Sequence, residues 1–217
     1  MKIQEKTFTL KSGRVKALQY LQYAPDRMKK GEKYPLIIAL HGAGERGNGQ
    51  CELLKMFPLL RMMEDGLQIP AIVVAPQCPC EWLWTDLCVE VKELADRIVE
   101  TMPVDTDRIV CTGLSMGGYG TWLMGITYPD FFAGLAPICG GGTSWAVAQL
   151  KNVPVWAFHG DADSVVPVNN SIEMCDRLAA AGGNVKLTLF HREDHDAWTP
   201  AFRDTKLIEW LLAQRKG

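Results

Sequence analysis

The chain has 217 residues, of which 47% are hydrophobic and 22% are charged, and its formal net charge is -2 at pH 7. This length suits one domain around a single core, and the near-neutral charge gives no electrostatic reason to expect nucleic acid or an anionic membrane as a partner. We therefore expect a globular protein that binds a small neutral molecule.

The apolar runs, such as PLIIAL from Pro35 and AIVVAP from Ala71, are too short to cross a bilayer. The first residues, MKIQEKTF, lack the apolar stretch of a signal peptide, so we expect a cytoplasmic protein. The seven cysteines show neither the spacing of a disulfide framework nor that of a metal site. We expect reduced thiols, no metal and no cofactor.

Two β-rich stretches, residues 5–10 and 15–23, open the chain and predict an antiparallel lead-in. After Lys33, short apolar runs alternate with segments that favour helices or loops. This alternation predicts a mostly parallel central sheet with helices on both faces. The runs are PLIIAL, AIVVAP, RIVCTG, GLAPIC, VPVWAFHG and VKLTLF.

The clearest predicted helix covers residues 86–102, where apolar side chains recur as one stripe before Pro103. Further helices are predicted after Ser115, over residues 169–181, and from Trp198 to the end of the chain. Residues 139–155 are too few to form a cap domain. A site at the carboxyl ends of the strands should therefore be open, with only loops above it.

Residues 113–117 read GLSMG, a GxSxG motif between a predicted strand and a predicted helix. A strand that turns directly into a helix holds the serine at a sharp corner and exposes its hydroxyl, and the flanking glycines allow the close approach of strand and helix. Met116 opens the helix, so its N–H is available for an oxyanion. We predict that Ser115 is a nucleophile.

A serine nucleophile needs a histidine base and an acid that orients the base. In the chain order serine, acid, histidine, the base is predicted to be His195, in the loop HREDHDAW, with His191 as the alternative. The predicted acid is Asp163 in GDADSVVP. Its competitor Asp161 is expected to cap a local turn.

An oxyanion hole needs a second backbone donor besides Met116. The glycine-rich HGAGERG follows the strand PLIIAL, and we predict that the donor is the N–H of Ala43. A phosphate-binding loop is the weaker alternative because the segment lacks a lysine followed by serine or threonine.

With GLSMGG, HGAGERG, GDADSVVP and His195 in place, the chain resembles α/β-hydrolase superfamily serine esterases of the phospholipase/carboxylesterase and dienelactone hydrolase type. DTDRIVCTGLSMGGYGTW, residues 105–122, resembles the prolyl oligopeptidase-like esterases, a group that includes feruloyl and acetyl xylan esterases. The resemblance implies a single α/β-hydrolase domain over residues 1–217, without a cap or the β-propeller of the peptidases. Dienelactone hydrolases carry a cysteine where this chain has Ser115.

Carried over by position, the resemblance implies the triad Ser115, Asp163 and His195, with the N–H groups of Ala43 and Met116 as the oxyanion hole. The implied function is a serine carboxylesterase that cleaves small carboxylic esters through an acyl-enzyme on Ser115, with acetyl or feruloyl esters of plant carbohydrate as the narrower expectation. The alternatives are a peptidase or acyl thioesterase of the same fold, or a non-catalytic ligand-binding protein.

The expected substrate pocket contains two tryptophans and two polar side chains. Trp84 and Trp198 could line an acyl or aromatic pocket, a plain core role being the alternative for each. Glu45 and Gln77 are expected to offer polar contacts at its rim. The expected partner is thus a small-molecule ester, and no oligomeric state is predicted.

Overall fold

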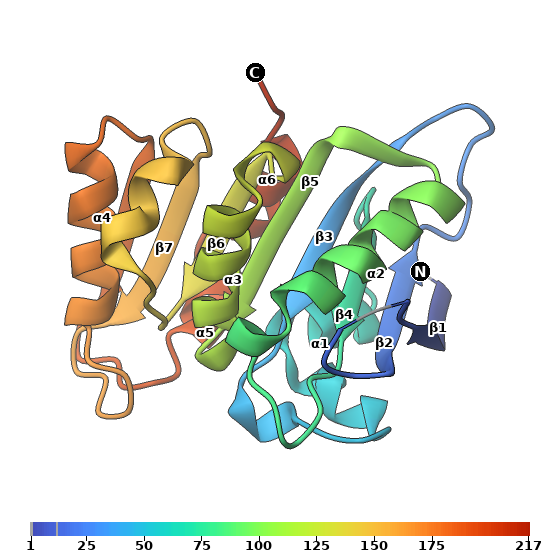
Figure 1. Ribbon diagram of the computed structural model, residues 1–217, viewed down its shortest axis with the longest axis horizontal. Helices are drawn as coiled ribbons and strands as arrows, with labels where there is room; N and C mark the ends of the chain where they lie inside the picture. Colours follow the sequence, from blue (N-terminus) through green and yellow to red (C-terminus); the bar gives the residue numbers. More distant parts are fainter. Residues whose placement is uncertain (1, 12) are drawn as a thin grey trace.

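The computed structural model describes residues 2–11 and 13–217. One eight-stranded sheet runs through the molecule in the order β1-β2-β4-β3-β5-β6-β7-β8 (Figure 1). The strands are β1 (Lys2–Thr9), β2 (Ala17–Ala24), β3 (Tyr34–Leu40), β4 (Ile72–Pro76), β5 (Val104–Leu114), β6 (Gly134–Ile138), β7 (Val155–Gly160) and β8 (Val185–Phe190).

The strand directions confirm the predicted antiparallel lead-in and mostly parallel sheet. β1 and β2 form an antiparallel hairpin, and β2 pairs antiparallel with β4. All the remaining pairs, from β4·β3 to β7·β8, are parallel. Each of the six predicted apolar runs forms one of the strands β3 to β8, so their carboxyl ends meet at one edge of the sheet.

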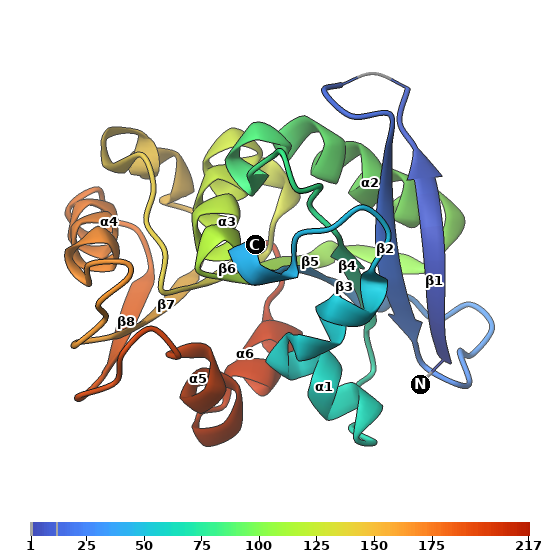
Figure 2. The same cartoon turned by 90° about the horizontal axis from the view of Figure 1, so that it is seen from below.

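Helices cover both faces of the sheet, as predicted. Figure 2 shows α2, α3 and α4 on one face and α1, α5 and α6 on the other. No helix among the described residues is both long and apolar enough to span a membrane. The helices are α1 (Pro58–Glu64), α2 (Cys88–Thr101), α3 (Met116–Thr127), α4 (Asn169–Ala180), α5 (Trp198–Asp204) and α6 (Leu207–Ala213), with 3-10 turns η1 (Ala43–Glu45), η2 (Cys51–Met56), η3 (Trp84–Asp86), η4 (Pro129–Phe131) and η5 (Ser144–Leu150).

The central strands are apolar along their whole length because helices bury both of their faces. Every residue of β3, β4 and β6 is buried. Two hydrophobic cores result, one on each side of the sheet: Trp122 lies in the core beneath α2, α3 and α4, and Phe202 lies in the core beneath α1, α5 and α6. The sheet is thus a rigid platform for the loops at its carboxyl edge.

Two predicted helices differ from the observed ones at their ends, and polar side chains explain both differences. The helix predicted from residue 86 begins only at Cys88, because the Asp86 carboxylate accepts the N–H of Leu83 and closes the separate turn η3. The last helix is interrupted between α5 and α6. There the hydroxyl of Thr205 donates to Ala201 O and accepts from Leu207 N, which replaces backbone hydrogen bonds at the break.

Candidate active site

Ser115 occupies the turn between β5 and α3, in a backbone conformation that side chains rarely adopt. Its φ is 54° and its ψ is -116°, and the Ser115 N–H donates to Ile138 O at 2.9 Å. A Cβ added at Gly113 would collide with the carbonyl of Gly117, and one added at Gly117 would collide with Leu40 O. The two glycines therefore let strand and helix close tightly around the strained serine.

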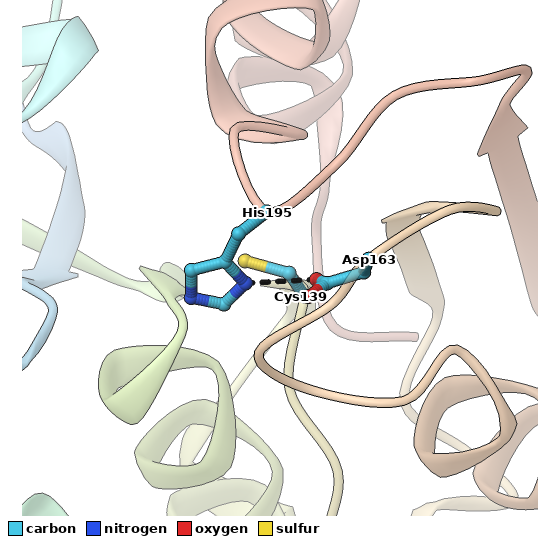
Figure 3. A group of neighbouring side chains, drawn as sticks. All are labelled: Cys139, Asp163 and His195. Carbon is cyan, nitrogen blue, oxygen red and sulfur yellow. Dashed lines mark hydrogen bonds and ion pairs between the residues drawn. The ribbon is translucent and has the colours of Figure 1, made fainter.

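The imidazole of His195 lies between Ser115 and Asp163. His195 Nε2 is 2.9 Å from Ser115 Oγ. His195 Nδ1 is 2.8 Å from Asp163 Oδ2, a contact that Figure 3 marks with a dashed line. Because an ionised carboxylate only accepts, Nδ1 carries the proton and Nε2 is free to accept the serine hydroxyl. The structure thus brings together the three side chains predicted as nucleophile, acid and base.

Asp163 is held as an anion by its hydrogen bonds. Its side chain is fully buried, and burial raises its pKa. Hydrogen bonds from His195 Nδ1 and from the backbone N–H groups of Val166 and Val165 outweigh this penalty, so the pKa of Asp163 lies below its ordinary value. A fixed negative charge therefore faces His195 at neutral pH.

The competing histidine and aspartate pair with each other, away from Ser115. His191 is exposed, and its Nδ1 lies 2.9 Å from Asp161 Oδ2. The other oxygen of Asp161 accepts Arg192 N at 2.7 Å, which is the local role expected for this aspartate. The geometry favours His195 and Asp163 over His191 and Asp161 as base and acid.

The predicted oxyanion donors come from the two segments next to Ser115. Met116 is the first residue of α3, where helix N–H groups lack acceptors within the helix. Gly42 packs against the end of β5, since a Cβ there would lie 2.9 Å from Leu114 Cδ1, and exposed Ala43 follows it. Both segments therefore lie beside the serine, and the donor roles of Ala43 and Met116 stay predictions.

His41 fixes the loop that carries Ala43. It is buried, its Nε2 accepts Cys78 N at 2.9 Å, and its Nδ1 therefore donates to Gly42 O. Burial lowers the pKa of His41 to about 4, so the ring is neutral at physiological pH. The sequence placed His41 at a strand end but gave no sign of this framework role.

For two of the predicted substrate contacts the structure favours a framework role, because their side chains are buried and already hydrogen-bonded. Trp84 is 1% exposed, donates Nε1–H to His41 O at 2.9 Å and packs edge-on against the His41 ring. Gln77 is also 1% exposed. Its amide donates to Glu45 O and Gln50 O and accepts Gly49 N. Both residues hold the loop after β3 in place.

The other two predicted contacts lie near the triad. Glu45 is half-buried, its Oε2 has no hydrogen-bond partner, and burial raises the pKa of its carboxyl group. Trp198 packs edge-on against His195, with 5.3 Å between ring centroids. It also lines a groove of about 490 Å³ between α1 and α5. The groove is lined by Met56, Pro58, Arg61, Met62, Asp65, Asp196, Trp198, Thr199, Phe202 and Arg203.

One grouping of side chains near the triad has the composition of a metal site. The thiol of Cys139, the carboxylate of Asp163 and the ring of His195 offer ligand atoms within 4.8 Å of one another (Figure 3). Burial raises the pKa of the Cys139 thiol far above its ordinary value, and metals bind the thiolate. Asp163 and His195 are already hydrogen-bonded to each other, so the arrangement favours a packing role for Cys139.

Comparisons with known proteins agree with this geometry. A model of the prolyl oligopeptidase family matches residues 142–213. The crystal structure of a thermostable esterase is 32% identical, with a TM-score of 0.86, and the match covers 98% of this chain and 63% of that one. "Probable feruloyl esterase C" of Aspergillus terreus is 24% identical over 169 residues, which are 76% of this chain and 62% of that protein.

The likeness to an acylaminoacyl peptidase of Pyrococcus horikoshii shows the fold alone. It is 17% identical, with a TM-score of 0.75, and the match covers 100% of this chain and 42% of that one. This chain thus spans less than two thirds of the length of each of these three proteins. Together the matches confirm the α/β-hydrolase fold and the resemblance to prolyl oligopeptidase-like esterases, and they support the prediction of a serine hydrolase.

The role of Trp84 as a framework residue can be tested by Trp84→Phe. The variant leaves the buried carbonyl of His41 without its donor, so we expect the free energy of unfolding in urea to fall by about 1–3 kcal/mol. The matched control is Trp198→Phe, at a half-buried ring, with an expected loss below about 1 kcal/mol. Equal losses in the two variants would contradict the assignment.

Proposed function

We propose that this protein is a serine carboxylesterase that hydrolyses small carboxylic esters through an acyl-enzyme on Ser115. The observation that carries the proposal is the continuous hydrogen-bonded chain from Ser115 Oγ through His195 to the buried carboxylate of Asp163. A hydroxyl needs such a base because it is a weak nucleophile at neutral pH. The resemblance to esterases over most of this chain supports the same reaction.

In the first half-reaction, Ser115 Oγ attacks the ester carbonyl while its proton moves to His195 Nε2. The negative oxygen of the tetrahedral intermediate is stabilised by the N–H groups of Met116 and Ala43, and Asp163 stabilises the protonated imidazole. His195 then gives the proton to the departing alcohol oxygen. In the second half-reaction, water attacks the carbonyl of the acyl-enzyme while His195 takes the proton of the water. His195 then gives this proton to Ser115 Oγ, so the carboxylic acid product is released and the serine hydroxyl is restored.

The narrower substrate class we propose is acetyl or feruloyl esters of plant carbohydrate. The departing alcohol takes its proton from His195, so it must lie on the histidine side of the serine. Trp198 packs on that histidine and lines the groove between α1 and α5, which combines apolar side chains with Arg61 and Asp65. An aromatic ring beside charged groups suits a sugar, which has apolar faces and many hydroxyls. The feruloyl esterase relative supports the acyl group.

A peptidase is the second candidate, because the matching family model is that of the prolyl oligopeptidases. Amide hydrolysis would use the same triad and oxyanion hole, so only the substrate distinguishes the two proposals.

The nucleophile is tested with Ser115→Ala. Because the base then has no hydroxyl to activate, we expect kcat for p-nitrophenyl acetate to fall by about 10⁴-fold or more. Circular dichroism should show an unchanged fold. Equal turnover by the variant and the parent protein would contradict the acyl-enzyme mechanism.

The pH dependence of kcat/KM follows from the protonation states of His195 and Asp163. The base works only when neutral, so kcat/KM should fall as the pH is lowered below neutrality and the imidazole takes up a proton. Asp163, whose pKa is lowered, stays ionised over this change in pH and adds no second step. The measurement is kcat/KM for p-nitrophenyl acetate from pH 5 to 9; a flat profile with acyl transfer rate-limiting would exclude a histidine base.

The substrate class is tested with a panel of acetyl, butyryl, octanoyl and feruloyl esters, acetylated xylan and a peptide anilide. We expect kcat/KM to be highest for the acetyl or feruloyl esters, with release of acetate from the xylan. Faster cleavage of the anilide than of every ester would favour the peptidase instead.

A further inference from the structure

A second histidine contacts the carboxylate that orients His195. His159 lies near the carboxyl end of β7, and its side chain is completely buried, as is that of Asp163. His159 Nε2 is 3.2 Å from Asp163 Oδ2, the same oxygen that accepts His195 Nδ1 at 2.8 Å. One carboxylate oxygen is therefore shared by two imidazoles.

The neighbours of His159 determine where its proton lies. Nε2 faces Val166 O at 3.0 Å as well as Asp163 Oδ2, and both of these atoms only accept. Nε2 must therefore carry a hydrogen, which points toward the carbonyl and the carboxylate. Burial lowers the pKa of His159.

The other nitrogen of His159 is held by a buried serine, which prevents the ring from turning. His159 Nδ1 lies 2.7 Å from Ser171 Oγ, and Ser171 Oγ lies 2.9 Å from Gly140 O. Ser171 donates its one hydrogen to Gly140 O, so the serine oxygen that faces Nδ1 is itself held in place. The ring is thus fixed from both sides, with its Nε2–H kept beside Asp163.

We propose that His159 is a positioning residue of the catalytic site: its Nε2–H shares Asp163 Oδ2 with His195 and draws part of the carboxylate's negative charge away from His195. The protonated imidazole formed during acyl transfer is then stabilised less than it would be by an unshared carboxylate. As a consequence, His195 stays neutral, and active as a base, to lower pH. This inference rests on the proposed function.

Other titratable groups also face the pair of Asp163 and His195. They are the Cys139 thiol beyond β6, Tyr119 on α3, and Asp194 and Asp196 on either side of His195. None of these residues is changed in the His159 variants. A shift that appears only on removal of the Nε2–H donor therefore reports on His159.

The test compares His159→Leu, which removes the donor, with His159→Gln, whose amide can reach the position of Nε2. For p-nitrophenyl acetate, we expect the midpoint of the acid limb of kcat/KM to move up by about half to one pH unit in His159→Leu. In His159→Gln it should stay near the parent value. A packing role would lower kcat/KM at every pH without moving the midpoint, and that result would overturn the proposal.

A third variant removes the same donor but keeps a polar side chain in the buried site, so the proposal can still be tested if His159→Leu does not fold. His159→Asn keeps an amide near the position of Nδ1, next to Ser171, but is too short to donate to Asp163. We expect the same upward shift as in His159→Leu. An acid limb that is unmoved in a folded His159→Asn protein would also overturn the proposal.

A second readout does not need turnover. In the Ser115→Ala background, NMR titration of the imidazole signals follows His195 directly, with each signal assigned by substitution of one of the four histidines. We expect the midpoint pH of the His195 titration to be higher in the His159→Asn variant than in the parent, and to be unchanged in the His159→Gln variant. If the parent protein hydrolyses none of the esters, the proposed function fails, while this titration still decides whether His159 acts on His195. An identical midpoint in all variants would reject that action.

Discussion

The positive φ of Ser115 is the constraint around which the site is built. The strained backbone at Ser115 is stabilised by its surroundings. The N–H of Ser115 donates to Ile138 O, and Gly113 and Gly117 let α3 approach both β5 and the end of β3. This close contact also brings the loop after β3 next to the first turn of α3. The strained serine and its two neighbouring segments are therefore one packed unit rather than separate loops.

Much of the fold was predictable because the physical signals were strong. Runs such as those of β3 and β4 are apolar at every position only when a strand is covered on both faces, and GxSxG between strand and helix specifies one geometry. Chain order favoured a pairing of His195 with Asp163 but left His191 and Asp161 as alternatives. The break between α5 and α6 was not predictable, since it depends on two hydrogen bonds of a single threonine.

The substrate contacts were harder to predict because sequence position near the site says nothing about the direction of a side chain. Trp84 and Gln77 follow β4 toward the carboxyl edge, where a pocket was expected, yet both turn inward and bind backbone atoms. His41 and His159 lie where the apolar runs PLIIAL and VPVWAFHG end, but their buried partners come from distant segments: Cys78 for His41, and Ser171 in α4 for His159. Such partners emerge only once the sheet has been assembled.

The order of the strands has a consequence for synthesis of the protein. Ser115 leaves the ribosome long before His195, which follows β8 at the outer edge of the sheet. In the proposed mechanism, the hydroxyl of Ser115 has no base until residue 195 has been added to the growing chain. In the proposed mechanism, a chain that stops before His195 should therefore be unable to react with esters in its surroundings.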